Sequence, residues 1–582
     1  MEGTWRARVL APILAPVLAL AVALLVTGPA LAPGFVLLRD MVFVPRQALG
    51  LDAFGLGGSL PRAVPADALL GLLTTVIPGD VLQKILLVGT IWLAVLGAAR
   101  LVPPGPDGRR GPAAGVAGLV YGWSPYVAER LLMGHWTLLL GFAALPWIAR
   151  AGLLVRAGER EALPRLVLAC APAALSPSGA VLAAGVALAT VGRKRVLQVF
   201  GVLTVLALPW VLAGALHPSG GISDPAGVPA FAARAENWGG ALLAVLGTGG
   251  LWNADAVPAS QASVLAPLAT LAVVGLAAYG WVAGGLHRGP LRRLPLLGLA
   301  GVVLAVAGAT PGLADLLEFA VREIPGAGLL RDGQKWAAWW ALPLAVGAGI
   351  GARHLSERLR GRVGAGLGAA VGAGVAAGAL LLPVAALPDL AWGVGDQLRT
   401  AAYPADWSQV RDALAADARP GDVLVLPFGA YRAFTWNGSR PSLDPVPRWL
   451  GRPTISDDTL VVSHRVVAGE DLRARQAGRA AGDPARLAAL GVGWILVEGD
   501  TPGRAVPGGV HSLPVAVTGS SLTLYRVPGA VAGPAPAPER VTAVVLAHAC
   551  ALGTVVGAAL WIAWRASTVT LRRRPLRKRV NE

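Results

Sequence analysis

An arginine and an aspartate, Arg39 and Asp40, stand side by side just after the first long apolar run of the chain. Ionisable side chains at the edge of a bilayer are costly unless they are hydrated, paired or used in function. A carboxylate at this place meets both water and the head of a lipid-borne substrate, so it can act as a general base that deprotonates an acceptor hydroxyl. The alternative is an interfacial Arg39–Asp40 ion pair that ends the helix.

Three further ionisable residues, Glu129, Arg130 and His135, lie in an aromatic-rich stretch between two apolar runs. Aromatic side chains such as Trp123 and Trp136 are expected where a membrane protein meets the lipid–water boundary. That preference accounts for the aromatic residues but not for three ionisable groups so close together. Two interpretations stay open: the three groups line a hydrated cavity, or they pair with one another.

A third stretch places two basic residues, Arg331 and Lys335, four positions apart at the start of another apolar run. Together with the N–H groups of a helix N-terminus, such a pair can hold an anionic phosphate. The alternative is a surface network of Arg331, Asp332 and Lys335. We expect these residues on the outward side of the membrane, where basic residues are less common than on the inward side.

The composition is that of a polytopic integral membrane protein. Of 582 residues, 55% are hydrophobic and only 14% are charged, whereas soluble domains carry about a quarter charged residues. The net charge of +17 comes from short basic loops between apolar runs, which is the positive-inside pattern and requires no nucleic-acid partner. The two cysteines, Cys170 and Cys550, lie inside apolar runs and cannot form a disulfide framework or a CxxC zinc site.

Apolar runs long enough to suggest membrane spans recur along the chain, and we read about twelve of them. They cover residues 9–31, 81–101, 111–123, 137–155, 163–175, 179–192, 196–216, 263–286, 292–310, 336–352, 364–388 and 541–564. Placing both termini in the cytoplasm puts every basic cluster inside, so we expect a multi-pass protein of the plasma membrane with that topology. The runs 111–123 and 163–175 are short and can be tilted or re-entrant helices.

The predicted fold is an all-α membrane domain of about twelve transmembrane helices with an extracytoplasmic α/β domain near the C-terminus. We assign residues 1–388 to the membrane domain, 389–540 to the α/β domain, and 541–582 to the last helix and a basic tail; the outward loops are 32–80, 217–262 and 311–335. Short apolar strands are predicted at 422–426, 493–497 and 521–525, and helices at 406–416 and 484–490. No phosphate-binding or nucleophile motif occurs in the α/β domain.

These features resemble the GT-C superfamily of polyprenyl-phosphate-sugar glycosyltransferases. An acidic residue soon after the first span, followed by interfacial helices, is similar to their first outward loop. The stretches from Trp123 to Arg130 and from Leu330 to Trp336 resemble actinobacterial members near the mycobacterial arabinofuranosyltransferases, and Leu487 to Val497 resembles the soluble domain of YfhO-type membrane proteins. The resemblance covers nearly the whole chain as architecture, and its motifs are short.

The resemblance implies a transferase that takes a sugar from a polyprenyl-phosphate donor and passes it to an envelope glycan, lipid or protein acceptor. It implies that Asp40 is the base, and that Arg331 and Lys335 hold the donor phosphate. It further implies a substrate cleft lined by Arg39, Glu129, Arg130 and His135. Many members of the superfamily carry a pair of acidic residues in this loop, whereas here Asp40 has no acidic neighbour before Asp52. Whether the reaction uses a divalent cation therefore stays open.

The alternative function is a non-catalytic protein for the assembly or transport of envelope polysaccharide. An ion-coupled transporter should carry ionisable residues on broken helices at mid-membrane. The predicted span centres contain almost no charged residues, and the charges lie at the outer edge. This placement favours the transferase.

Overall fold

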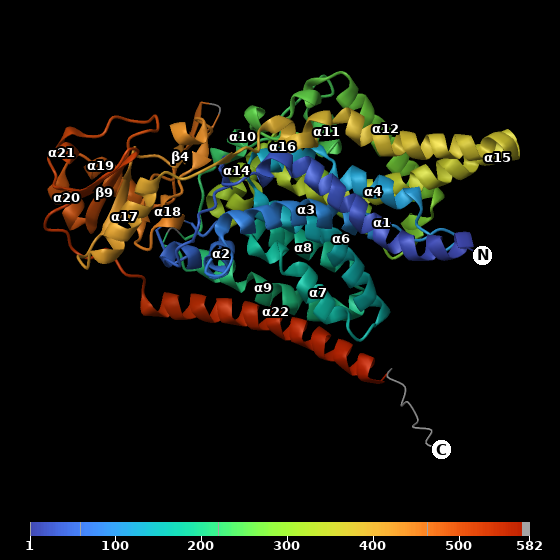
Figure 1. Cartoon of the computed structure of the whole chain (residues 1–582), viewed down its shortest axis with the longest axis horizontal. Helices are drawn as coiled ribbons and strands as arrows, with labels where there is room; N and C mark the ends of the chain where they lie inside the picture. The colour runs from blue at the N-terminus through green and yellow to red at the C-terminus, as the bar shows by residue number, and fades with distance from the viewer. Residues whose placement is uncertain (1, 59, 219, 463, 573–582) are drawn as a thin grey trace, which may run out of the picture.

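The computed structural model describes residues 2–58, 60–218, 220–462 and 464–572, and most of them are helical. Apolar helices form one long body, because only a helix satisfies all backbone hydrogen bonds of a single segment in lipid. A smaller domain that contains a sheet lies at one end of this body (Figure 1). The helices of the body are α1 (Glu2–Thr27), α3 (Gly79–Leu101), α4 (Pro112–Gly122), α6 (Trp136–Ala157), α7 (Ala162–Cys170), α8 (Pro177–Thr190), α9 (Val196–Ala215), α12 (Leu265–Ala283), α13 (Leu294–Ala307), α15 (Ala337–Ala386) and α22 (Pro538–Arg572).

Within the described residues, six helices are long and apolar enough to cross a membrane. They are Gly79–Leu101, Trp136–Ala157, Arg193–Ala215, Leu265–Ala283, Leu367–Ala386 and Pro538–Thr568. Shorter apolar helices cover Ala15–Leu31, Ala162–Leu175, Pro177–Thr190 and Leu294–Ala307. Helices α4 and α7 rise only about 17 and 14 Å, less than the roughly 30 Å of hydrocarbon. Twelve complete crossings therefore stay a prediction, as does the cytoplasmic placement of both termini.

Helix α15 is not one straight rod, because its two ends turn back on each other. The hydroxyl of Ser356 donates to the carbonyl oxygen of Gly372, sixteen residues later, over 3.4 Å. Sixteen residues of continuous helix would separate these groups by about 24 Å. The chain therefore reverses between them, which agrees with the two separate apolar runs read at 336–352 and 364–388.

The α/β domain contains a mixed five-stranded sheet in the order β10-β11-β9-β3-β6. Its strands are β3 (Asp422–Leu426), β6 (Thr454–Ile455), β9 (Val492–Glu498), β10 (Val515–Thr518) and β11 (Leu522–Arg526). Strand β3 is parallel to β6 and β9, and β11 is antiparallel to β9 and β10. The three strands predicted from the sequence are confirmed to within one residue at each end.

Both faces of the sheet are covered by helices, so its central strands are buried throughout. Side chains of Val423 and Val425 pack in one core with α17 (Ala405–Ala416). Leu424 and Leu426, which alternate with them, pack on the opposite face with α19 (Leu472–Ala480) and α20 (Pro484–Ala489). Burial on both faces explains why β3 and β9 read as continuous apolar runs rather than alternating ones.

Short elements lie in the segments between these helices and in the α/β domain. They are α2 (Ala66–Leu73), α5 (Pro125–Leu132), α10 (Gly227–Ala230), α11 (Gly240–Leu246), α14 (Leu313–Glu323), α16 (Ala391–Asp396), α18 (Val446–Trp449) and α21 (Gly508–His511), with strands β1 (Phe35–Val36), β2 (Thr400–Ala401), β4 (Tyr431–Arg432), β5 (Ser442–Leu443), β7 (Leu460–Val462) and β8 (Arg465–Val467). Helix α2 and the turn after it expose the apolar side chains of Leu72 and Val76. Exposed apolar groups here agree with the surface-lying helix expected in the first outward loop.

The first outward loop is clamped between the helical body and the α/β domain. Strand β1 pairs antiparallel with β2, and the side-chain amide of Asn437 donates to the carbonyl oxygen of Leu37 over 2.9 Å. The hydroxyl of Tyr403 donates to the carbonyl oxygen of Phe43 over 2.9 Å. This joint connects the residues around β1, which shortly precede Asp40, to the α/β domain.

Candidate active site at the joint

Asp40 lies where the first outward loop meets the turn between α5 and α6. The backbone N–H of Asp40 donates to the carbonyl oxygen of Met133 over 3.1 Å. Gly134, with φ of +75°, makes this contact possible: a Cβ at this position would lie 2.1 Å from the backbone nitrogen of Met41. A glycine is therefore required, both for the backbone conformation and for the close approach of the two segments.

We expect Gly134→Ala to lower the free energy of unfolding by about 2–4 kcal/mol, since it adds overpacking to positive-φ strain. Gly158→Ala is the matched control, because Gly158 has φ of +80° but no neighbouring atom within 4 Å of the added Cβ. Thermal melting in detergent measures both. Equal drops in melting temperature in the two variants would show that the close approach of Gly134 to Met41 does not contribute to the destabilisation.

The two oxygens of the Asp40 carboxylate have different partners. His135 Nε2 lies 3.1 Å from Oδ2, and the hydroxyl of Tyr431, on strand β4, donates to Oδ1. Burial by itself would raise the pKa of Asp40, but the hydrogen bonds from His135 and Tyr431 and the charge of Arg448 together bring it below its ordinary value. The side chain is 37% exposed, so an ionised carboxylate reaches water.

The histidine connects Asp40 to a buried arginine. Arg130 lies 2.8 Å from Nδ1 of His135. Because a guanidinium can only donate, Nδ1 must accept, and the proton of the neutral ring must sit on Nε2. His135 therefore donates to Asp40, and its ring is fixed between one donor and one acceptor.

Arg130 is completely buried and forms the centre of the network. Its guanidinium donates to both carboxylate oxygens of Asp332, over 2.8 and 3.1 Å, and also to the side-chain oxygen of Gln334. Burial by itself would raise the pKa of Asp332, but the charge and hydrogen bonds of Arg130 together with the charge of Lys335 bring it down to about 2. Such a bidentate charged pair is both strong and directional.

Behind Arg130, two buried carboxyl groups face each other. Glu129, with no exposed surface, accepts a hydrogen bond from Gln334 over 3.1 Å. Burial, followed by the charge and hydrogen bond of Glu236, raises the pKa of Glu129 well above its ordinary value. Burial also raises the pKa of Glu236. Burial therefore favours the protonated form of both carboxyl groups.

The cations predicted from the third stretch lie on the same side of the network but in different contacts. Lys335 is buried, and burial lowers its pKa to about 8 against the opposing effect of Asp332. Its ammonium lies 5.4 Å from the ring centre of Trp336, and in the described part of the chain no carboxylate forms an ion pair with it. Arg331 instead approaches Glu470 of the α/β domain at 3.5 Å. Glu470 also pairs with Arg62 of the first outward loop.

Arg39 has a different position from the one the sequence suggested. Its guanidinium donates to the carbonyl oxygens of Leu132 and Asp255, over 2.7 and 2.9 Å. The Arg39–Asp40 ion pair considered from the sequence is absent from the described ion pairs. Arg39 has φ of +49°, so the chain turns there and the two side chains take separate partners. Its predicted contact with substrate stays a prediction, and its observed contacts anchor the loop.

The structure therefore connects Asp40 to Arg130 through His135, which contacts both. Glu129 is connected to Arg130 through Gln334. Sequence reasoning missed Tyr431, Gln334 and the paired role of Asp332. It also missed Arg62 and Glu470. Asp332 and Gln334 lay inside the stretch that had been singled out, so their polarity next to Arg331 was a usable signal. Tyr431 and Glu470 gave no signal, because nothing local in the α/β domain marks them.

The donors around Asp40 do not fit a divalent cation. Both carboxylate oxygens already accept hydrogen bonds, from a histidine N–H and a phenol. Among the described residues, no group of three or more His, Cys, Asp or Glu side chains could hold a metal ion. Hard cations such as Mg²⁺ require several oxygen ligands. We therefore derive no step through a metal.

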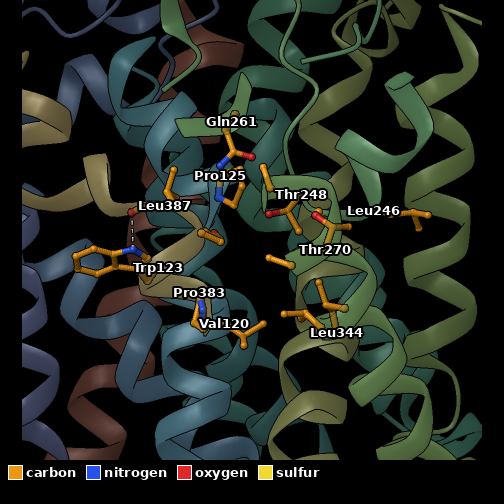
Figure 2. A pocket seen from close by; sticks show the side chains of 16 residues that line it. Val120, Trp123, Pro125, Leu246, Thr248, Gln261, Thr270, Leu344, Pro383 and Leu387 are labelled. Atoms are coloured by element: carbon orange, nitrogen blue, oxygen red, sulfur yellow. Dashed lines mark hydrogen bonds between the residues drawn. The ribbon is translucent and has the colours of Figure 1, made fainter. Parts of the chain in front are cut away.

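A separate cleft of about 60 Å³ opens nearby, between the α4–α5 turn, α11, α12 and the end of α15. Figure 2 shows Val120, Leu344 and Leu387 lining it together with the hydroxyls of Thr248 and Thr270. The carbonyl oxygen of Thr248 accepts from Gln334 over 3.1 Å, so the cleft lies behind the buried layer of Glu129 and Gln334. Its lining residues do not include Asp40 or the residues connected to it, His135, Tyr431, Arg130 and Asp332.

Comparison with known proteins gives a likeness of fold. No protein-family model matches the sequence, and no curated protein matches it. The cryo-EM structure of arabinofuranosyltransferase AftD from Mycobacteria superposes with a TM-score of 0.54 at 19% identity, over 88% of this chain and 40% of that protein. A mutant form of the same enzyme gives a TM-score of 0.51 at 19% identity, over 89% and 42%. The chain thus spans about two fifths of the enzyme it resembles. The GT-C arabinofuranosyltransferase resemblance expected from the sequence is confirmed at the level of fold.

Proposed function

We propose that this chain is a membrane glycosyltransferase of the GT-C type that moves a sugar from a polyprenyl-phosphate donor to an envelope glycan, lipid or protein acceptor at the outer membrane face. The observation that carries the proposal is the contact between an exposed carboxylate, Asp40, and His135, itself fixed by the Arg130–Asp332 pair. A carboxylate with one side buried and one side open to water suits a base that meets both substrates. The likeness to AftD supports the reaction class and suggests arabinofuranose as the first sugar to test.

In the proposed reaction, the acceptor hydroxyl attacks the anomeric carbon of the donor sugar. The new bond joins the acceptor oxygen to this carbon, and the bond between the carbon and the phosphate oxygen breaks. Asp40 takes the hydroxyl proton, and the polyprenyl phosphate leaves as an anion. His135 stays neutral and holds the carboxylate in place, since its Nδ1 is occupied by Arg130.

The leaving phosphate needs positive charge, and three cations lie at the joint. Lys335 has no carboxylate partner among the described ion pairs, whereas Arg331 and Arg62 share the single carboxylate of Glu470. Fixed cations of this kind stabilise developing negative charge in a transition state.

The experiment that tests the proposal uses the purified full-length chain in lipid vesicles. It is supplied with synthetic radiolabelled farnesyl-phosphoryl arabinofuranose and an arabinan oligosaccharide, and then with the mannose donor and a mannan acceptor. The expected result is labelled, elongated oligosaccharide with one farnesyl phosphate released per sugar added. Absence of any elongated product with either donor, from protein shown to be folded by thermal melting, would contradict the proposal.

Lys335 predicts a pH dependence. Its side chain has a pKa of about 8. The amine is therefore positively charged below this pH and loses its charge as the pH rises through it. We therefore expect kcat/KM of the wild type to fall above pH 8, since kcat/KM reports the free enzyme. Lys335→Arg retains its charge and should move this alkaline limb upward by at least about one pH unit. If kcat/KM falls at the same alkaline pH in the wild type and in Lys335→Arg, Lys335 does not bind the donor phosphate.

A further inference from the structure

Tyr431 belongs to the α/β domain, and the structure fixes its position from two sides. It lies on β4, which pairs with β5 in a short hairpin. The next residue, Arg432, is buried and forms ion pairs with Asp444, over 3.1 Å, and with Glu498 at the end of the central strand β9. The hairpin is therefore attached to the sheet through a buried charged cluster.

The same hairpin is attached to the loop that carries Asp40. The backbone N–H of Arg39 donates to Pro441 over 2.6 Å, and that of Leu443 donates to Arg39 over 2.7 Å. Arg39 and Ser442 accordingly form a bridge between the two segments. Tyr431 and Asp40 meet through a joint held by backbone hydrogen bonds, and not through a chance contact of two flexible side chains.

The chemistry of the contact is that of a neutral donor on an ionised acceptor. Burial, with the charge of Asp40, raises the pKa of Tyr431 well above its ordinary value, so the phenol keeps its proton. It donates to Oδ1 of Asp40 while His135 donates to Oδ2. Each carboxylate oxygen then keeps one further lone pair for an acceptor hydroxyl. Tyr431 is 38% exposed, so one side of the contact is open to water.

We propose that Tyr431 is a positioning residue for Asp40, and that the α/β domain thereby completes the active site of the membrane domain. The inference rests on the proposed function for the role of Asp40. A carboxylate held by one donor can rotate about its last bond, whereas donors on both oxygens fix the plane in which it accepts a proton. The domain in which no motif was found from the sequence thus has a defined task in catalysis.

The test compares Tyr431→Phe with Tyr525→Phe, a matched loss of one hydroxyl in the same domain. Tyr525 lies on β11 and contacts His511, away from the joint. The charged and titratable groups that act on Asp40 are His135, Tyr431, Arg448 and Arg39. All but Tyr431 are unchanged in both variants.

The first readout needs no sugar transfer. Purified protein is treated with a water-soluble carbodiimide and glycine amide from pH 3 to 8, and labelling of the Asp40 peptide is measured by mass spectrometry. The carbodiimide reacts with the protonated carboxyl, and loss of a donor to the ionised form favours protonation. Tyr431→Phe should move the labelling midpoint upward by about one pH unit, and Tyr525→Phe should not move it. Unchanged midpoints in both variants would overturn the inference.

The second readout is transfer from farnesyl-phosphoryl arabinofuranose. For Tyr431→Phe we expect the acid limb of kcat/KM to shift upward with the labelling midpoint, and kcat to fall about tenfold with little change in KM. Tyr431→Met is the second variant if the first does not fold. If the labelling midpoint shifts in Tyr431→Phe but neither the wild type nor a variant transfers sugar, the proposed function is wrong, and the hydrogen bond from Tyr431 to Asp40 is still supported. Transfer at wild-type rates in Tyr431→Phe would overturn the positioning role alone.

Discussion

Replacement of Asp40 by asparagine is expected to lower the rate of sugar transfer by about 10²–10⁴-fold, the usual contribution of a general base. The amide has the shape of the carboxylate and can still accept from His135 and Tyr431 through its oxygen. It cannot take a proton from the acceptor hydroxyl at neutral pH. The variant should therefore insert and melt like the wild type, and the loss should appear in kcat. Transfer of radiolabelled arabinofuranose in vesicles measures it.

The matched control is Asp255→Asn, which removes an exposed carboxylate from the next outward loop. Arg39 donates to the backbone carbonyl oxygen of Asp255, and this hydrogen bond is kept in the variant; the carboxylate acts on Arg39 only through its charge. The variant should therefore keep most of its activity. Full transfer by Asp40→Asn would remove Asp40 as the base. Equal losses in the two variants would point to a general need for negative charge outside the membrane.

Replacement of Arg130 by methionine should destabilise the protein strongly. Arg130 is fully buried and donates to Asp332, His135 and Gln334. Breaking a buried ion pair by removing one partner costs roughly 3–5 kcal/mol, because the remaining charge stays unpaired. We expect a loss near the lower figure, about 3 kcal/mol, since Asp332 is 19% exposed and can gain some water. Transfer should also be lost, because His135 is no longer fixed.

Two comparisons make this prediction specific. Arg165→Met breaks an exposed ion pair between Arg165 on α7 and Glu161 just before this helix, and we expect it to cost less than about 1 kcal/mol. Adding Asp332→Asn to Arg130→Met removes the unpaired charge and should restore part of the melting temperature but none of the transfer. A melting temperature of Arg130→Met equal to that of Arg165→Met would show that the buried pair contributes little to stability.

The membrane embedding and the strands of the α/β domain could be predicted from the sequence because both depend on local patterns. An uncharged run of about twenty residues has to cross or enter lipid, and the run at β9 has to be buried whatever its neighbours are. The stretches around Asp40, Arg130 and Arg331 could also be singled out, since ionisable groups beside apolar runs are costly unless they are used.

The partners of these groups were decided only by the tertiary structure. His135 lies 95 positions from Asp40, Asp332 lies 202 from Arg130, and Tyr431 lies 391 from Asp40. Sequence neighbours misled in one case: Arg39 and Asp40 are adjacent but bind different partners, because φ of +49° at Arg39 turns the chain between them. Local periodicity fixes which segments are buried, whereas side-chain pairing depends on how distant segments pack. For that reason the sequence determined the apolar helical body and which residues are candidates for the site, and the packed joint determined which of them meet.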